Sequence, residues 1–291
     1  MTVRLSPTPV KAVFHALGRC WGGELPSNTA NPICDKLVGQ LGGLRRLTAC
    51  SSASAVGGLF SHKGPRRNNE DAGLVVAAPG RFIAVAVADG VGGLKSGEVA
   101  SYRAVCTVLR ELLAAAGDLR GFYQDWFRRL FDEAHEEVAR VAHGGATTLV
   151  VAVYDLTSHM LHVAHVGDSV AYVVLERGDG WVEYGLLTQD LDEAVDAGGP
   201  YITQAVGHRS YRGPHYYLYN LAGFEGFLKA IVAASDGVDD FIDKGLYRKV
   251  PELFRKKKSA REVAKTLACS AIRSGGRDNA TAAVAVILPR I

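Results

Sequence analysis

The fold of this chain is decided by residues 81–93, which read RFIAVAVADGVGG. Seven apolar residues in a row, Phe82 to Ala88, predict a strand that is buried on both faces. The strand ends abruptly at Asp89, and a loop with three glycines follows. A carboxylate at the mouth of a buried strand is unfavourable unless a cation meets it. The stretch therefore predicts a core strand that presents an acidic residue to a cation.

Each of three other apolar runs has acidic residues at one end: Glu70 and Asp71, Asp236, and Asp278. Together with Asp89 they form four carboxylate clusters at strand ends, far apart in the sequence. Hard cations such as Mg²⁺ and Mn²⁺ prefer oxygen ligands of this kind. The sequence therefore predicts that the clusters meet at one oxygen-lined metal site.

Composition and charge exclude several classes of protein. The chain has 291 residues, is 48% hydrophobic and carries a net charge of +3, so it can form one large domain or two modest ones and gives no indication of nucleic-acid binding. No apolar run approaches the roughly 18 residues of a membrane span. Five cysteines, an odd number without a C-x-x-C pair, are interpreted as reduced thiols of a cytoplasmic protein without a zinc site.

The N-terminal part differs from the rest in composition. Its first 55 residues contain only Glu24 and Asp35 as acids, against six Lys and Arg. Such a start occurs in targeting peptides, but four prolines interrupt any long amphipathic helix. We assign residues 1–52 to an extension that packs on the domain, with a targeting segment as the alternative, and residues 53–291 to the domain itself.

The periodicity of the domain predicts an α+β fold. Strands are expected at 53–60, 74–78 and 82–88, helices at 97–116 and 122–142, and then four strands between 147 and 187. A polar, poorly periodic stretch at 190–211 is expected to form a surface flap. A strand at 228–234, helices at 246–256 and 260–272 and a last strand at 280–288 complete the chain, the second helix starting with a capping box at Ser259. This order favours a four-layer α-β-β-α sandwich, two antiparallel sheets flanked by helices.

Eight short motifs in a fixed order resemble those of the metal-dependent protein serine/threonine phosphatases, the phosphatase 2C family. The resemblance runs from about residue 53 to 291. It rests on RRNNED at 66–71, ADGVGG at 88–93, GEVAS at 97–101, GATT at 145–148, VGDS at 166–169, LTQD at 187–190, SDG at 235–237 and DN at 278–279.

The resemblance implies a role for each acidic residue. Asp89 would bridge two divalent ions, Mn²⁺ or Mg²⁺, with the backbone carbonyl of Gly90 as a further ligand. Asp236 and Asp278 would bind the second ion, and Glu70 would lie beside it. Asp71 would orient a water on the metal, and Asp168 matches a carboxylate of a third, weaker site. Two such ions lower the pKa of a bridging water and clamp the phosphoryl oxygens.

Arg66 would hold the substrate phosphate in a planar fork that lysine cannot reproduce. The expected partners are phosphorylated proteins, and we expect a monomer. Two positions depart from the family. Val91 stands where many eukaryotic members carry a histidine, a candidate general acid, and Val170 stands where the family's G-D-S-R motif has its arginine.

Other interpretations of these residues remain open. The aspartates could be turn or cap residues, and Arg66 could pair with a surface acid. Gly90 to Ser96 is similar to a phosphate-binding loop of a nucleotide-binding domain, although Leu94 stands where that loop needs glycine. A phosphatase-like fold could also bind without catalysing. The basic run 255–258 is interpreted as a solvated helix end, with a docking patch for acidic partners as the alternative.

Overall fold

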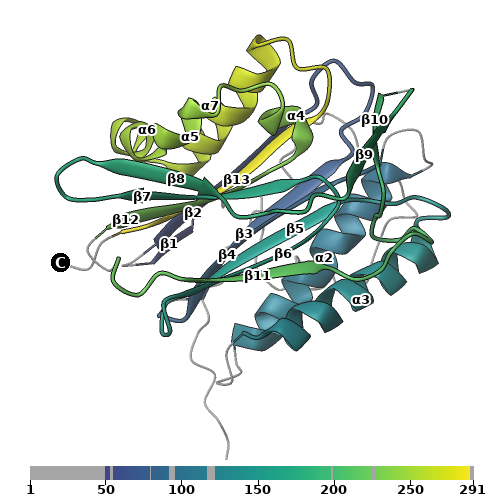
Figure 1. Ribbon diagram of the computed structural model, residues 1–291, viewed down its shortest axis with the longest axis horizontal. Helices are drawn as coiled ribbons and strands as arrows, with labels where there is room; N and C mark the ends of the chain where they lie inside the picture. The colour runs from purple at the N-terminus through teal and green to yellow at the C-terminus, as the bar shows by residue number, and fades with distance from the viewer. Residues whose placement is uncertain are drawn as a thin grey trace, which may run out of the picture.

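Two antiparallel sheets stack face to face in the computed structural model (Figure 1), which describes residues 50–52, 55–78, 80–91, 96–116, 122–197, 199–224 and 227–288. In spatial order, the six-stranded sheet consists of β1 (Cys50–Ser52), β2 (Ala55–His62), β13 (Ala280–Ile287), β12 (Leu228–Ala234), β7 (Val170–Glu176) and β8 (Val182–Leu186). The five-stranded sheet consists of β11 (His215–Asn220), β6 (Met160–Val166), β5 (Leu149–Asp155), β4 (Phe82–Asp89) and β3 (Asp71–Ala78).

Helices cover the outer face of each sheet. Two long helices, α2 (Gly97–Ala116) and α3 (Gln124–Val141), lie on the five-stranded sheet (Figure 1). The six-stranded sheet is covered by α4 (Asp236–Asp239), α5 (Gly245–Arg248), α6 (Val250–Lys257) and α7 (Ala260–Arg273). The predicted four-layer sandwich is therefore confirmed.

Strand β4 is buried on both faces, as its continuous apolar sequence predicts. Its alternate residues Ile83, Val85 and Val87 join the core between the sheets. The other four, from Phe82 to Ala88, join the core beneath α2 and α3. Asp89 then emerges at the end of the strand, so the burial of β4 fixes where this carboxylate lies.

The capping box at the start of α7 is confirmed on its serine side, because Ser259 Oγ accepts a hydrogen bond from the Glu262 N–H at 3.4 Å. Several strands were not predicted. The stretch expected as a flap contains the hairpin of β9 (Glu193–Asp196) and β10 (Gly199–Ile202), and β11 forms the edge of its sheet. β11 reads HYYLYN, which lacks the regular alternation of apolar and polar residues that indicates a half-buried strand.

The expected N-terminal extension lies outside the described residues, except for β1. No helix in the described ranges is long and apolar enough to cross a membrane. The interpretation of all cysteines as reduced thiols is wrong for Cys106 on α2, which is disulfide-bonded, whereas Cys269 on α7 is free. Spacing in the sequence could not show this, because the bond depends on which chain segment lies against the helix.

Helix α7 approaches β2 so closely that only glycine fits at position 58. A Cβ at Gly58 would lie 2.1 Å from the backbone nitrogen of Arg261 and 2.5 Å from its Cα. Because both atoms belong to the helix backbone, no side-chain rotation can relieve the overlap.

We expect Gly58→Ala to lower the free energy of unfolding by roughly 1–3 kcal/mol, because the helix must move off the sheet. Urea unfolding measures this. Gly185→Ala in β8 is the matched control, since a Cβ there meets nothing within 4 Å. Equal effects of the two substitutions would contradict the close approach of α7.

Candidate active site

Two carboxylates face each other where β3 begins and β4 ends. The antiparallel register pairs Asp71 directly with Asp89. Like charges opposite each other destabilise a strand pair, so this pairing is unfavourable for folding alone. The backbone of Asp89 is nevertheless held firmly, because its N–H donates to Thr148 Oγ1 at 2.9 Å and its carbonyl accepts from the Thr148 N–H at 2.8 Å.

The other sheet brings a second pair of acids to the same place. Asp236 follows β12 as the first residue of α4, and Asp278 precedes β13. The two sheets are joined across the site by Ser235, whose Oγ donates to Asp71 Oδ2 at 3.0 Å and accepts from the Thr281 N–H at 3.1 Å. Sheet stacking therefore brings together acids that are more than 200 residues apart in the chain.

Burial and mutual repulsion raise the pKa of these carboxyls. Burial, together with the charge of Asp236, raises the pKa of Asp71 to about 7 against the hydrogen bonds of Thr281, Ser235 and Asp89, which lower it. The pKa of Asp89 lies well above its ordinary value because of burial and then the charges of Asp71, Asp236 and Asp168. Burial likewise raises the pKa of Asp278, with Asp236 adding to it and Arg66 opposing it. The acids thus share one electrostatic environment.

The loop before β3 places Arg66 and Glu70 beside Asp278. Arg66 forms an ion pair with Asp278 and donates from Nε to the carbonyl of Arg277 at 3.3 Å. Burial raises the pKa of Glu70, and Glu98 on α2 adds to the effect. The guanidinium of Arg66 remains about half exposed, so it can still meet a ligand from solvent.

Asn279, the residue directly before β13, holds this loop in place. Its Oδ1 accepts from the Glu70 N–H at 2.8 Å, and its Nδ2 donates to the carbonyls of Lys63 and Asn68 at 2.7 and 2.9 Å. All of its side-chain bonds go to the loop backbone, so Asn279 sets the position of Glu70 and Arg66. The D-N motif contained this residue, but its amide gave no sign in the sequence of which loop it would hold.

Asp168 lies on the loop between β6 and β7. Burial raises its pKa to about 7, with Asp236 as the next cause, so Asp168 belongs to the same acidic cluster. The neighbouring Gly167 N–H donates to Oδ2 of the buried Asp192 at 3.0 Å, and Gln204 Nε2 donates to the same oxygen at 2.8 Å. Asp192 therefore holds the loop between β6 and β7. The contacts of this loop were not predicted, because Val170 stands where the family motif has an arginine.

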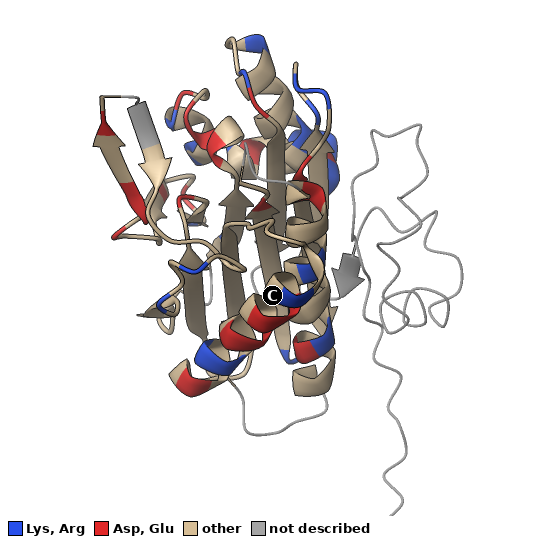
Figure 2. Cartoon of the chain, turned by 90° about the vertical axis from the view of Figure 1, so that its right-hand side faces the viewer, with Lys and Arg blue, Asp and Glu red and all other residues tan. Residues whose placement is uncertain are grey.

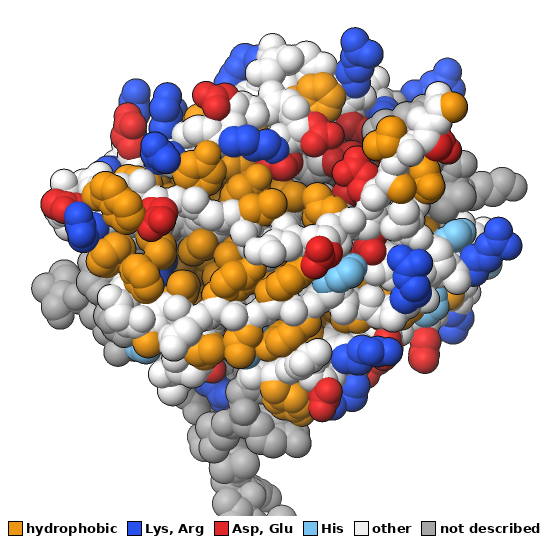
Figure 3. Space-filling model, in the orientation of Figure 1, with side chains coloured by type: hydrophobic (Ala, Val, Ile, Leu, Met, Phe, Trp, Pro, Cys, Tyr) orange, Lys and Arg blue, Asp and Glu red, His pale blue; other side chains and the backbone are white. Residues whose placement is uncertain are grey.

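A cavity of about 330 Å³ opens beside these acids under the β9–β10 hairpin. It is lined by Val91, Asp168, Val170, Leu191, Glu193, Tyr201, Ile202, Asp236, Asp239 and Asp240. Five of these residues are acidic and none is basic. Figure 2 views the molecule from this end, where acidic residues mark the strand ends, and Figure 3 shows acidic side chains gathered near the hairpin.

The acids have the donor chemistry of a hard-cation site. Asp71 Oδ1 is buried without a hydrogen-bond partner, an arrangement that a cation or an ordered water would satisfy. Across the described ranges, however, no three Asp, Glu, His or Cys side chains converge closely enough to surround an ion. Asp278 is instead held by its ion pair with Arg66. The residues therefore fit a hard cation in the kind of their donor atoms.

The structure thus brings together all eight residues singled out in the sequence. Gly90 joins them through its N–H, which donates to the carbonyl of Glu70 at 3.1 Å. The sequence motifs contained Ser235, Thr148 and Asn279 but gave them no role, and sequence reasoning missed the acids Asp239 and Asp240. The acids carried a signal, because three and four residues after Asp236 is one helical turn.

Comparisons with known proteins agree with this geometry. The family model described as protein phosphatase 2C matches residues 60–270. The chain is 26% identical to the serine/threonine phosphatase stp of Listeria monocytogenes, over 74% of this chain and 89% of that protein.

Solved structures resemble the chain as well. The serine-threonine phosphatase 2C from Toxoplasma gondii superposes with a TM-score of 0.65 at 16% identity, over 82% of this chain and 97% of that one. The serine/threonine phosphatase PstP/Ppp from Mycobacterium tuberculosis superposes with a TM-score of 0.58 at 25% identity, over 81% and 100%.

The raised pKa of Asp71 predicts how stability depends on pH without metal. A carboxyl with a folded-state pKa above its unfolded value binds more protons when folded, so its stabilisation is present below about pH 4 and lost as the pH rises to about 7. In chelator, we expect Asp71→Asn to raise the free energy of unfolding at pH 8 by roughly 1–3 kcal/mol. At pH 4 the two proteins should be nearly equal.

Urea unfolding across this pH range measures the effect. Asp179→Asn is the control, because this exposed acid lies in the β7–β8 turn and its pKa is lowered by its hydrogen bond with Arg177. It should give no gain at pH 8. A constant difference between Asp71→Asn and the unmodified chain at every pH would contradict the raised pKa.

Proposed function

The chain belongs to the protein phosphatase 2C family of serine/threonine phosphatases, and from this we propose that it removes phosphate from phosphoserine and phosphothreonine in proteins, with Mn²⁺ or Mg²⁺ as cofactor. One observation carries the proposal. Both sheets end in buried or half-buried carboxylates at the same place, where burial and the charge of Asp236 raise the pKa values of Asp71, Asp89, Asp168 and Asp278. Such an arrangement is unfavourable for folding and suits a site that concentrates cations.

The family is metal-dependent, and the ligand assignment is part of our proposal. We assign Asp89 and the carbonyl of Gly90 to the shared side of two ions, Asp236 and Asp278 to the second ion, Glu70 beside it, and Asp168 to a third, weaker site. When bound, the ions activate water and neutralise the charge that develops on the phosphoryl group. The raised pKa values support this assignment, because a nearby cation would stabilise carboxylates whose ionisation burial and mutual repulsion now oppose.

Asp71 is assigned to the attacking water. Its Oδ2 is occupied by the Ser235 hydroxyl, whereas its buried Oδ1 has no hydrogen-bond partner. Oδ1 can therefore accept a hydrogen bond from a water molecule and orient its lone pair towards phosphorus. Ser235 fixes the carboxylate plane, so the water is oriented by a group that is itself held in place.

Arg66 is assigned to the substrate phosphate. The backbone carbonyl of Arg277 and the carboxylate of Asp278 hold one side of its guanidinium. A planar guanidinium has five N–H donors, so the exposed ones remain for phosphate oxygens. The ion pair also means that Arg66 orients Asp278, a second function beyond the one that the sequence suggested.

The metal dependence is tested by phosphopeptide hydrolysis. We expect turnover of a phosphoserine peptide with Mn²⁺ and none with excess chelator. Asp236→Asn should lower kcat/KM at least about 100-fold, because it removes one charge from ligands that act together. Asp243→Asn, an exposed acid that caps the start of α5, should behave like the unmodified chain. Turnover that persists in chelator would overturn the proposal.

Val91 lines the cavity beside Asp168 and Asp236, so a side chain at this position faces the site. A serine alkoxide leaves poorly without a proton, whereas a nitrophenolate leaves readily, and a well-placed general acid contributes about 10²–10⁴-fold. We expect Val91→His to raise kcat for phosphoserine peptides about tenfold or more and to leave nitrophenyl phosphate nearly unchanged. The peptide rate should fall above about pH 6.5 as the imidazolium deprotonates.

Steady-state kinetics on both substrates across pH 5–9 check this expectation. Val91→Gln is the control, since it adds a polar side chain of similar reach without a titrating proton. Equal changes for both substrates, or the same gain with glutamine, would show that position 91 does not protonate the leaving group.

A further inference from the structure

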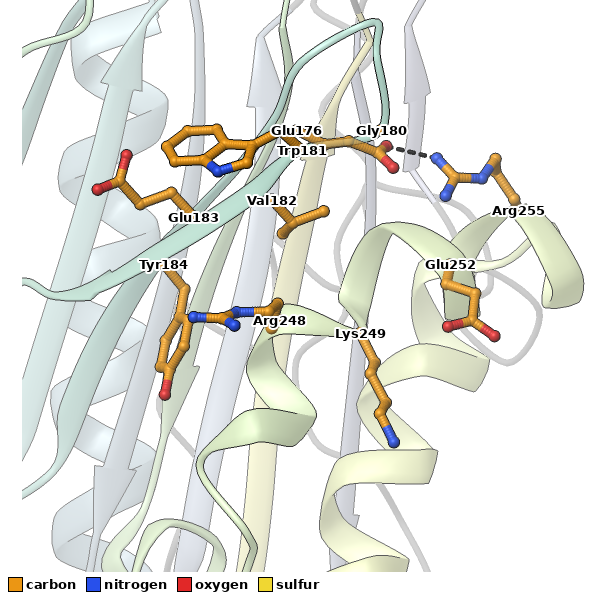
Figure 4. Close-up of a pocket in the computed structure, with 10 residues that line it drawn as sticks. All are labelled: Glu176, Gly180, Trp181, Val182, Glu183, Tyr184, Arg248, Lys249, Glu252 and Arg255. Atoms are coloured by element: carbon orange, nitrogen blue, oxygen red, sulfur yellow. Dashed lines mark hydrogen bonds and ion pairs between the residues drawn. The ribbon is translucent and has the colours of Figure 1, made fainter.

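A second cavity lies away from the acidic site, between the edge strand β8 and the helices α5 and α6. Its volume is about 710 Å³, and Figure 4 shows the residues that line it. They are Glu176, Gly180, Trp181, Val182, Glu183, Tyr184, Arg248, Lys249, Glu252 and Arg255. We call this cavity the β8–α6 groove. None of its residues belongs to the proposed catalytic machinery.

One wall of the groove is a strand edge with open backbone groups. Among the described strands, β8 is the last of its sheet and pairs only with β7. The Leu187 N–H donates to Ala171 and the Trp181 carbonyl accepts from Arg177, so odd-numbered residues bond to β7. In an antiparallel ladder the alternate residues, Val182, Tyr184 and Leu186, then direct their N–H and C=O groups away from β7. Such an edge can accept another strand.

The opposite wall is basic. Arg248 stacks over the ring of Tyr184, with 5.4 Å from its guanidinium carbon to the ring centroid (Figure 4). Neither Arg248 nor Lys249 forms an ion pair with a described residue, and both are exposed. Stacking fixes the guanidinium plane and leaves its N–H groups free for an acidic ligand.

The segment 248–258, which includes this wall, is rich in positive charge. Six of the eleven residues 248–258 are Lys or Arg, and only Glu252 is acidic. Within the groove Arg255 is neutralised by Glu176, and Glu183 is exposed on β8. Lys256, Lys257 and Lys258 extend the positive potential beyond the groove, at the end of α6. The helix wall therefore attracts negative charge.

Exposed apolar side chains lie at both ends of β8, Trp181 in the lining of the groove and Leu186 beyond it. Trp181 is 49% exposed and Leu186 41% exposed, at the two ends of β8. Figure 3 shows hydrophobic side chains along this strand, next to basic side chains over α5 and α6. Exposed aromatic and aliphatic groups beside an open strand edge are typical of surfaces that bind extended peptides.

We propose that the β8–α6 groove binds an extended acidic segment of the phosphoprotein substrate, at a distance from the phosphoserine. The segment adds a strand to β8 through the backbone groups of Val182, Tyr184 and Leu186. Its acidic side chains on the helix side of the sheet meet Arg248 and Lys249. This inference rests on the proposed function for the identity of the partner, whereas the binding itself does not require catalysis.

The strand edge and the aromatic groups favour a peptide over nucleic acid. A single-stranded nucleic acid has no backbone N–H and C=O groups in strand register, so it would use only the charges and rings. Binding that depends on charge alone would spread over the whole run 248–258. Peptide binding depends on Arg248, Lys249 and the edge of β8 together.

Direct binding is measured first, without phosphate in the ligand. The probe is a fluorescein-labelled nonapeptide of alternating glutamate and valine, followed by anisotropy at low salt. Removing two exposed charge contacts with Arg248→Ala/Lys249→Ala should raise Kd about tenfold. The matched control Lys256→Ala/Lys257→Ala removes the same charge outside the groove and should change Kd less than about twofold through screened, long-range attraction.

The strand edge is tested by a second pair of variants. Leu186→Pro removes an outward N–H without touching the ladder to β7 and should raise Kd at least about fivefold, while Leu186→Ala should have a smaller effect. Circular dichroism and urea unfolding establish that both variants fold. A probe with proline in place of its central valines keeps the charge and should bind weakly to the unmodified chain.

Kinetics then test docking by a substrate. A phosphoserine peptide is joined to the acidic nonapeptide by about 20 Gly and Ser residues, whose root-mean-square span is roughly 25 Å. Docking should lower KM at least about tenfold relative to the same peptide with lysine for glutamate, with kcat unchanged. The gain should disappear in Arg248→Ala/Lys249→Ala, and nitrophenyl phosphate turnover should stay the same in every groove variant.

The outcomes separate this inference from the proposed function. If the peptide binds normally but no phosphate ester is turned over, the phosphatase proposal is overturned. The bound segment can then no longer be assigned to a phosphoprotein substrate. Normal turnover with equal effects of the two double variants, or with tighter binding of an oligonucleotide than of the peptide, would overturn the groove as a peptide site. If binding is lost only in variants that fail to fold, the groove as a peptide site is overturned as well. Lys256→Ala/Lys257→Ala and Leu186→Ala are the folded references for this comparison.

Discussion

Asp71 and Asp89 face each other across the β3–β4 pair, in a site that burial has taken out of water. Burial raises the pKa of both carboxyls, and the charge of Asp71 raises the pKa of Asp89 further, so the ionised pair opposes folding. The chain keeps them there because β4 is buried on both faces and cannot shift its register without exposing one of two cores. Core packing thus enforces an arrangement that electrostatics disfavours. This conflict supports the proposed cation site, because a bound cation would relieve the repulsion.

Neutral hydrogen bonds hold the charged groups in place. The hydroxyls of Ser235 and Thr148 and the amide of Asn279 bond to the acids or to the backbone beside them. A lysine or arginine in these positions would neutralise the carboxylates and compete with a metal ion. Hydroxyls and amides fix geometry without removing the negative charge. Arg66 is the exception, and it lies at the rim, where a phosphate can share it.

The sequence predicted the layers of the fold and the acids of the site, because both have short-range signatures. Continuous apolar runs such as 82–88 indicate buried strands, and acids at their ends mark the edge where the strands meet. The β9–β10 hairpin and β11 were not predictable, since their exposed residues have no clear period. The contacts of Asn279 and Asp192 depend on which loops pack together, which only tertiary structure fixes. The pairing of Arg66 with Asp278, 212 residues apart, is of the same kind.

A net charge of +3 conceals two surfaces of opposite sign. The cavity beside the proposed catalytic site is lined by five acids and no base, and the segment 248–258 has six cations and one acid. The first surface would attract metal ions and basic groups of a ligand, and the second would attract acidic groups. A ligand whose two ends differ in charge would therefore be oriented before it makes contact, since the fields act over about a Debye length, roughly 8–10 Å. The separation of the two charges means that a ligand is favoured in one orientation, which the composition of the chain does not reveal. Such a preference can discriminate between phosphoproteins whose phosphoserines are chemically the same.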